Sequence, residues 1–216
     1  MSGLALVGGN SILGSSYGVD AEAHVVLQRH GSDAYNLPHV IDHAANMQAL
    51  ADAGCDRVLA LGSVGSLREE LPVGTFLAPD DFIALGPSPS IHHDYRAHRV
   101  PGFTPGWRAR VIETWAQSSS TPLVGGGVYW QSAGPRFETP AEIRIFAQHA
   151  HVVGMTLASE CVVAGELGLD YAAICIVDNM ANGVGSTPLT LDQFEDGKQA
   201  NHQRLIEALD AVLPQL

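Results

Sequence analysis

An aromatic ring and a carboxylate stand side by side at Phe137-Glu138, inside the stretch GPRFETPAEIR from Gly134 to Arg144. The glycine-proline pair that opens this stretch marks a turn after an apolar run. Thr139-Pro140-Ala141-Glu142 has the pattern of a capping box with proline at the first helical position. The sequence therefore predicts a strand, a loop and a helix in succession, which is where open α/β sheets bind ligands. A flat apolar ring beside a hydrogen-bond acceptor suits a heteroaromatic ligand that carries N–H groups.

Three other segments suit an anion, and each follows a predicted strand. Arg29-His30-Gly31 places a guanidinium where it can bind phosphate bidentately, although a surface salt bridge explains Arg29 equally well. The segments Gly8–Ser11 and Gly62–Ser66 are rich in small residues, which let backbone N–H groups face an anion. The first has the wrong glycine spacing for a dinucleotide-binding fingerprint. Because parallel strands end at one edge of a sheet, all three segments could converge on a single phosphate.

Apolar runs of strand length alternate with helical patterns along the chain. Strands are expected at Leu4–Val7, His24–Gln28, Arg57–Leu61, Thr75–Ile83, Val124–Gln131, Val152–Thr156 and Tyr171–Val177. Helices are expected after Pro38, after Thr104, at Glu142–Gln148, at Ser159–Leu167 and from Thr190 on, the last with Phe194, Leu205, Ile206, Leu209 and Val212 in the core. This alternation predicts a single α/β domain over residues 1–216, with a central mixed, largely parallel sheet flanked by helices.

The composition excludes some classes of partner. A formal net charge of −12 with only 11 Lys and Arg argues against a nucleic-acid surface, which needs clustered positive charge. No apolar run is long enough to span a membrane and no export signal is visible, so a cytoplasmic protein is expected. The three cysteines lack metal spacing and are expected to be reduced and buried.

A cluster of histidines lies in the least regular part of the chain, between Gly86 and Pro105. His92, His93 and His98 together with Asp94 invite a metal site, but adjacent histidines on a regular element cannot both face one ion. The cluster is better explained as part of a loop over a pocket or at a subunit contact. No metal is expected.

In several segments the chain closely resembles the trimeric purine nucleoside phosphorylase and methylthioadenosine phosphorylase family, and the resemblance covers nearly the whole sequence. The matching segments are VGGNSILG near the start, LQRHG at Leu27–Gly31, a helix ending AAN at Asn46, GSVGSLREE at Gly62–Glu70, GPRFETPAEIR, VVGMTLASE at Val152–Glu160 and VDNMANG at Val177–Gly183. The spacing of GPRFE and GMT, together with their order relative to RHG, is the most specific part of this signal.

The resemblance implies a reaction and a set of site residues. Members of this family cleave the N-glycosidic bond of a purine nucleoside with phosphate as nucleophile and need no cofactor. The residues that match phosphate ligands are Arg29, His30, the Ser63 backbone N–H, the Thr156 hydroxyl, and Asn10 or Ser11. The ribose is expected to rest on Met155 and the purine to stack on Phe137, while Glu138 and Asn179 read the edge of the base.

The same resemblance implies a homotrimer in which a neighbouring subunit completes each site. The segment that matches the donated residues is His98–Pro105, with His98 or Phe103 as the candidates. The partners expected are thus a small purine nucleoside, inorganic phosphate and other copies of the chain.

The chemistry of the base-reading residues favours 6-oxopurines. The Asn179 amide can donate to O6 and accept from a protonated N7, which stabilises the negative charge that builds on the leaving purine. Glu138 can accept from N1–H, whereas the unprotonated N1 of adenine would face the carboxylate with a lone pair. Inosine, guanosine and 5′-methylthioinosine are therefore the expected substrates, and the 5′ end is expected near Thr190, Leu191 and the loop of Gly183 to Leu189.

The chain departs from the family pattern at three places, one of which is the segment between the first glycine loop and Arg29, which is shorter than usual, so that a peripheral hairpin is expected to be absent and the pocket more open. Asn10-Ser11-Ile12 interrupts the first glycine loop, so the usual hydroxyl ligand of phosphate is either lost or replaced by a donor from Asn10 or Ser11. Asp178 is a carboxylate beside Asn179, and it either raises the cost of a purine anion or points away. These departures keep open two alternatives, a nucleoside hydrolase and a non-catalytic nucleoside-binding protein, although a hydrolase would leave Arg29 and His30 without an anion.

Overall fold

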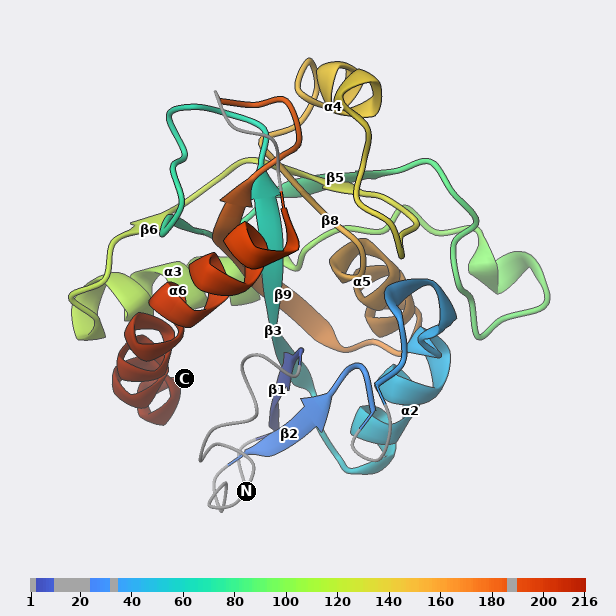
Figure 1. The fold of residues 1–216 in the computed structure, drawn as a ribbon. Helices are drawn as coiled ribbons and strands as arrows, with labels where there is room; N and C mark the ends of the chain where they lie inside the picture. The colour runs from blue at the N-terminus through green and yellow to red at the C-terminus, as the bar shows by residue number, and fades with distance from the viewer. Residues whose placement is uncertain (1–2, 10–23, 32–34, 186–189) are drawn as a thin grey trace.

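The computed structural model describes residues 3–9, 24–31, 35–185 and 190–216 (Figure 1). The strands are β1 (Leu4–Gly8), β2 (Val25–Gln28), β3 (Arg57–Ser66), β4 (Phe76–Leu77), β5 (Asp81–Ala84), β6 (Leu123–Val124), β7 (Val128–Gln131), β8 (Val152–Gly154) and β9 (Asp170–Met180). The helices are η2 (Pro38–Val40), α2 (His43–Asp52), η3 (Tyr95–Ala97), α3 (Pro105–Ser118), α4 (Pro140–Phe146), α5 (Leu157–Glu166), α6 (Leu191–Val212) and η4 (Leu213–Gln215), where η marks a 3₁₀ helix.

One sheet joins these strands in the order β5-β7-β8-β3-β9-β4-β6, with β1 beside β3 and β2 beside β1. The pairs β3–β8 and β4–β9 are antiparallel, and the other pairs are parallel. The predicted α/β fold with a mixed, largely parallel sheet is therefore confirmed. Two of its inner strands, β3 and β9, are long and form the axis of the molecule (Figure 1).

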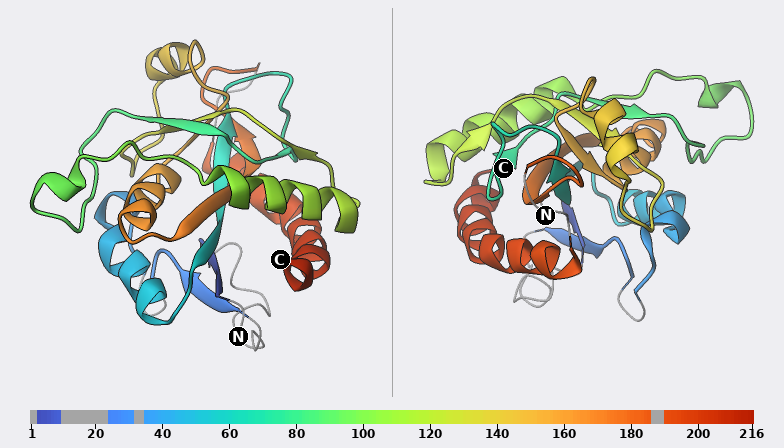
Figure 2. Two further views of the ribbon diagram at one scale, coloured as in Figure 1. Left: turned by 180° about the vertical axis from the view of Figure 1, so that it is seen from behind. Right: turned by 45° about the horizontal axis from the view of Figure 1, so that its top comes forward.

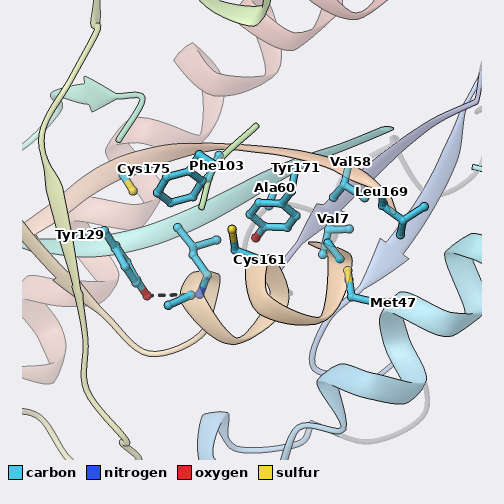
Figure 3. Close-up of a cluster of buried hydrophobic side chains, with 14 of the residues drawn as sticks. Val7, Met47, Val58, Ala60, Phe103, Tyr129, Cys161, Leu169, Tyr171 and Cys175 are labelled. Carbon is cyan, nitrogen blue, oxygen red and sulfur yellow. Dashed lines mark hydrogen bonds between the residues drawn. The ribbon is translucent and has the colours of Figure 1, made fainter. Parts of the chain in front are cut away.

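Helices cover both faces of the sheet. α2 and α5 lie over one face and α3 and α6 over the other (Figures 1 and 2). On the first face, Met47 of α2 and Cys161 of α5 belong to one buried cluster with Tyr171 of β9 (Figure 3). On the second face, Trp115 of α3 and Leu209 of α6 belong to another. β9 contributes alternate residues to the two clusters, as expected for a strand buried on both faces.

Three segments differ from their predicted structure. Gly62–Ser66 is not a glycine-rich loop but the second half of β3, because its backbone stays paired with β9 throughout. The single strands expected at Thr75–Ile83 and Val124–Gln131 are each divided into two short strands that pair with different partners, so that the chain crosses the sheet within each segment. Hydrophobic periodicity does not reveal such a crossing, because both halves are apolar.

Among the residues that the structure describes, none pairs with β3 on one side over part of its length. β1 pairs with it as far as Ala60, and β8 pairs with it only from Gly65 on. In the gap between these two strands the Leu61 carbonyl accepts a hydrogen bond from the Arg29 side chain at 2.6 Å. Because residues two apart along a strand face the same side, the Ser63 backbone N–H faces this gap as well. Through this gap the Arg29 side chain, which follows β2, reaches the middle of β3.

The pairing of β3 with β9 shifts by one residue at Asp178. Val64 pairs with Val177 and Gly65 pairs with Asn179, so Asp178 is the extra residue of a β-bulge. The Asn179 amide consequently lies on the same face of the sheet as Gly65, where a Cβ added to Gly65 would come within 3.1 Å of Asn179 Nδ2. The bulge sets the direction of the Asn179 side chain.

Helix α6 crosses the sheet beside this bulge at unusually short range. A Cβ added to Gly197 would lie 1.7 Å from the carbonyl oxygen of Asp178, so only glycine allows the helix to lie this close. The close approach fixes the first turns of α6 over the end of β9.

We expect Gly197→Ala to push α6 away from β9 and to lower the free energy of unfolding by about 1–3 kcal/mol, the usual cost of overpacking. Gly165→Ala in α5 is the matched control, since nothing lies within 4 Å of its added Cβ. That variant should keep or raise stability by up to about 1 kcal/mol, because alanine is the better helix former. Urea unfolding measures both, and a Gly197→Ala protein as stable as the parent would contradict the close packing.

Candidate active site

A cavity of about 420 Å³ opens at the edge of the sheet where β2 ends and where β3, β8 and β9 come together. It is large enough to enclose a nucleoside-sized ligand. Eight of the predicted site residues line it, namely Arg29, His30, Ser63, Phe137, Glu138, Met155, Thr156 and Asn179. Segments that lie far apart in the sequence thus converge as predicted.

The other four predicted residues do not line this cavity. Asn10 and Ser11 lie outside the described residues, although Gly9 just before them is part of the lining. His98 is exposed at the end of η3, on the loop that extends away from the sheet (Figure 1). Its side chain is free to reach another molecule.

Phe103 cannot serve a neighbouring subunit, and this prediction needs correction. Its side chain is only 5% exposed and belongs to the core on the α5 face of the sheet (Figure 3). The ring packs edge-on against Phe82 at 5.8 Å and stacks on Tyr171 at 6.2 Å, measured between ring centroids. A ring held by the core of its own chain is not available at the surface, which leaves His98 as the candidate from that segment.

Arg29 forms a buried ion pair with Glu160. Its Nε donates to Oε1 at 2.5 Å and its Nη2 donates to Oε2 at 2.8 Å, and both side chains are almost completely buried. Burial by itself would raise the pKa of the Glu160 carboxyl, but the adjacent guanidinium holds that pKa below its ordinary value. Tyr171 adds a hydrogen bond to Oε2 at 2.7 Å. The sequence left open whether Arg29 binds phosphate or forms a surface salt bridge. The structure shows a salt bridge that is buried and not at the surface, and the guanidinium still borders the cavity.

His30 is oriented by its backbone and by a neighbouring ring. Nδ1 lies 2.7 Å from the carbonyl oxygen of Asn36, so the neutral ring carries its proton on Nδ1 and a lone pair on Nε2. Tyr35 stacks on the ring with centroids 4.6 Å apart. Burial lowers the pKa of His30, and the Arg29 charge adds to this effect. A neutral His30 can accept a hydrogen bond from the proton of a monohydrogen phosphate.

The Thr156 hydroxyl is free to act on a ligand because other groups serve the start of α5. The backbone N–H groups of Thr156 and Leu157 donate to the hydroxyl of Tyr129 at 3.1 and 3.4 Å. Gln131 accepts from the Ser159 N–H at 3.1 Å. Thr156 caps the helix without a side-chain hydrogen bond, and it is 8% exposed within the cavity lining.

Phe137 and Glu138 face the same cavity from the loop before α4. The predicted capping box of this helix is present, with Thr139 and Glu142 each accepting from the other's backbone N–H. Glu138 is buried and accepts a short hydrogen bond from Ser132, which leaves its second oxygen for a ligand. Phe137 is 40% exposed, as a stacking surface must be before a ligand covers it.

Met155 lies beneath the turn that opens this loop. Gly134 has a φ of 65°, a left-handed conformation that glycine adopts without strain. A Cβ at Gly134 would lie 2.7 Å from the Met155 sulfur, so the missing side chain also makes room for the thioether. Turn and thioether together form one wall of the cavity.

Asp178 points away from the base-reading amide. Ser63 donates a short hydrogen bond to its carboxylate, and Asn201 of α6 donates another at 2.8 Å. The neighbouring Asn179 donates one N–H to the Met180 carbonyl at 2.9 Å and keeps its second N–H and its oxygen for a ligand. The sequence left open whether the Asp178 carboxylate raises the cost of a purine anion or points away, and the structure shows that it points away.

Helix α6 supplies cavity-lining residues that the sequence analysis either assigned to the core or did not identify. Leu205, Leu209 and Val212 are buried as predicted, whereas Ile206 is only half-buried. Phe194 lines the cavity, with its ring edge-on to that of Phe137 and the two ring centroids 5.6 Å apart. Glu195 and Lys198 of the same helix line it too. A glycine within a helical pattern indicates close packing, so Gly197 was the signal that the first turns of this helix reach the site.

Neither a metal centre nor a membrane span is found in the part of the chain that the structure describes. No three His, Cys, Asp or Glu side chains there are grouped so as to hold an ion, and no helix there has the length and hydropathy to cross a bilayer. The His92 to His98 segment forms an extended loop around η3.

A family model and individual relatives identify the same kind of protein as similar to this chain. Residues 12–214 match the family model described as the phosphorylase superfamily. A probable 6-oxopurine nucleoside phosphorylase of Archaeoglobus fulgidus is 36% identical over 195 residues, which cover 90% of this chain and 80% of the relative. A probable S-methyl-5′-thioinosine phosphorylase of Methanothermobacter thermautotrophicus is 38% identical over 192 residues, covering 88% and 68%.

The fold has a close counterpart among solved structures. A methylthioadenosine phosphorylase from Schistosoma mansoni, in complex with adenine, superposes with a TM-score of 0.79. The match covers 99% of this chain and 91% of the other at 24% sequence identity. At this identity the likeness concerns the fold.

The buried Asp178 carboxyl generates a pH-dependent prediction. Burial raises its pKa above that of an unfolded aspartate, so its contribution to stability is complete below about pH 3.9 and is lost as the pH rises through the folded-state pKa. Asp178→Asn removes this loss, and the variant should therefore gain stability relative to the parent between pH 4 and pH 7.

Urea unfolding at several pH values measures the effect. Asp52→Asn, at an exposed position of α2, is the control with the same change in net charge. Parallel profiles of the parent and Asp178→Asn would show that the carboxyl is not held in the environment described here.

Proposed function

The chain belongs to the phosphorylase superfamily, and on that premise we propose that it cleaves 6-oxopurine nucleosides with inorganic phosphate, giving the free base and a ribose 1-phosphate. One observation carries the proposal. A single cavity brings together groups suited to a purine and groups suited to an anion, although these come from five separate segments of the chain. Catalysis by orienting an anion against C1′ of the ribose requires this combination.

The proposed reaction exchanges one bond at C1′ for another. An oxygen of monohydrogen phosphate attacks C1′ while the C1′–N9 bond breaks and its electron pair passes to the purine. The phosphate gives up its proton to solvent and the purine takes one up at N7, so the base leaves neutral. The transition state has oxocarbenium character at the sugar and negative charge on the base, so stabilising that charge lowers the barrier. No covalent intermediate with the protein is needed, and no cofactor takes part in the proposed reaction.

Asn179 is the residue proposed to stabilise the leaving base. Its free N–H donates to O6 and its oxygen accepts from a protonated N7, and the bond to Met180 holds the amide in place. This arrangement strengthens as charge builds on the ring, which is the condition for lowering the barrier rather than only tightening binding. The Asp178 carboxylate points towards Ser63 and Asn201, so it does not directly oppose the negative charge on the base.

Glu138 is proposed to select 6-oxopurines. One of its oxygens is occupied by Ser132, and the other accepts from N1–H of hypoxanthine or guanine. Adenine would present a lone pair to this buried carboxylate, a mismatch that costs about 1–3 kcal/mol or more. The names of the relatives from Archaeoglobus and Methanothermobacter are consistent with this preference.

At the 5′ end of the nucleoside, the cavity lining favours substrates with an apolar 5′ substituent, in addition to ordinary nucleosides that carry a 5′-hydroxyl group. Leu37, Leu191 and Phe194 line the cavity, whereas Thr190 does not. 5′-Methylthioinosine is therefore the second substrate we propose. The sequence showed no polar anchor in this region.

We also propose a homotrimer in which His98 completes the site of a neighbour. His98 is exposed, and large apolar side chains beside it are exposed too, Tyr95 by 81% and Val100 by 99%. Apolar groups presented this fully are typical of surfaces that another molecule covers. A cytoplasmic location is proposed with it.

The test is release of free base from inosine, guanosine, 5′-methylthioinosine and adenosine, each with and without phosphate. We expect phosphate-dependent release from the first three and a kcat/KM for adenosine that is at least about a hundredfold lower. Asn179→Ala should reduce turnover by about a hundredfold or more. Glu138→Gln, which keeps the size of the side chain and removes its charge, should reduce the difference in kcat/KM between guanosine and adenosine.

Other outcomes identify the alternatives. Base release without phosphate would indicate a hydrolase, and inosine binding in calorimetry without any release would indicate a nucleoside-binding protein. A preference for adenosine would contradict the role of Glu138, and turnover within a few-fold of the parent in Asn179→Ala would contradict that of Asn179.

A further inference from the structure

A phosphate dianion entering this cavity meets little uncompensated positive charge. The whole chain carries a formal charge of −12, and the charge of Arg29 is already balanced by Glu160 in a bidentate pair. Burial, with Arg29 as a further cause, lowers the pKa of His30, which keeps that ring neutral. Desolvating an anion without a compensating charge is costly. Another cation is needed for tight binding of phosphate.

Lys198, the only lysine in the sequence, lies where such a cation is needed. It lines the large cavity and also a second cavity of about 10 Å³, roughly the space of one water molecule, and Ser63 lines both. Its ammonium contributes to lowering the pKa of His30 after burial and Arg29, and it opposes the burial that raises the pKa of Asp178. The charge therefore lies between the end of β2 and the bulge of β9.

The present partner of Lys198 is one that an anion can replace. Nζ lies 3.0 Å from an oxygen of Glu195, three residues earlier on α6, and the carboxylate is 56% exposed. Exposed pairs of this kind contribute little to stability. The ammonium also lies 5.0 Å from the centroid of Phe194. Gly197 fixes the helix backbone against β9, so the flexible lysine side chain can move while its Cα stays in place.

We propose that Lys198 is a phosphate-binding residue of this site, held by Glu195 when the site is empty and transferred to the phosphate when the anion binds. This inference rests on the proposed function and deepens it, because it names the group that supplies the missing positive charge. Arg29 then acts mainly as a rigid donor that is already neutralised by Glu160, and Lys198 supplies the net charge.

A single lysine makes direct observation possible. Reductive methylation with ¹³C-formaldehyde keeps the charge and labels only Lys198 and the chain's α-amino group, and the spectrum of Lys198→Arg identifies the lysine signal. Titration with inorganic phosphate, without nucleoside, should shift the Lys198 signal saturably. The α-amino signal should not follow the same curve. A Lys198 signal unmoved by phosphate would overturn the proposal.

Variants separate a phosphate contact from a packing role. Lys198→Met should raise the Kd of phosphate in calorimetry by about tenfold or more, as expected for a lost charge-assisted hydrogen bond, whereas Lys198→Arg should stay within a few-fold of the parent. Glu195→Gln should tighten phosphate binding by a few-fold, because it removes the competing carboxylate. A merely structural lysine would not give opposite effects at the two positions.

Arg204→Met is the matched control. It removes a cation from the same helix, but one that donates to the Gly74 carbonyl at 2.9 Å and lies against Phe76, away from the cavity lining. Its phosphate affinity should equal that of the parent. If Arg204→Met weakens phosphate as much as Lys198→Met does, the effect is one of overall charge and the proposal is wrong.

Kinetics distinguish failure of this inference from failure of the proposed function. If the parent protein cleaves inosine, Lys198→Met should raise the KM for phosphate by about tenfold and change the KM for inosine by less than about threefold. Equal rises in both constants would overturn the role of Lys198 while leaving phosphorolysis intact. If the parent releases no base, saturable phosphate binding that depends on Lys198 still supports the inference.

Discussion

The buried pair of Arg29 and Glu160 is the interaction on which the candidate site depends. It joins the end of β2 to α5, and the same guanidinium donates to the Leu61 carbonyl of β3, where the sheet has a gap. The Tyr171 hydroxyl adds β9 to the cluster. Four elements are thus fixed around one charge pair. Each ion is costly to bury alone, and the bidentate geometry with its added hydrogen bonds compensates for that cost.

A second constraint is the direction of side chains at the centre of the sheet. The bulge at Asp178 sends one carboxylate towards Ser63 and α6 and turns the Asn179 amide towards the cavity. Gly197 then lets α6 lie directly on the bulge, which brings Phe194 and Lys198 to the same cavity. The side chains suited to phosphate and those suited to a purine therefore line the same cavity, because β9 has an extra residue at Asp178 and α6 has no side chain at Gly197.

Much of this site could be predicted from sequence, and the failures have physical causes. Capping boxes, strand ends and a family resemblance located Phe137, Glu138 and Asn179, because local patterns and motif order are visible in one dimension. The partner of Arg29 was not visible, since Glu160 lies 131 residues away and only strand order brings the two together. Phe194 was assigned to the core because an apolar residue on a helix face gives the same pattern whether it covers a core or a cavity.

The central role of this ion pair is tested most directly by the free energy of unfolding of Glu160→Gln, measured with urea at neutral pH. We predict a loss of about 3–5 kcal/mol, because the change leaves the Arg29 charge buried without a counter-ion. Asp94→Asn, which disrupts an exposed pair with Arg96, should leave the transition almost unchanged and serves as the control. A loss below about 1 kcal/mol for Glu160→Gln would contradict the claim that the site is built on this pair.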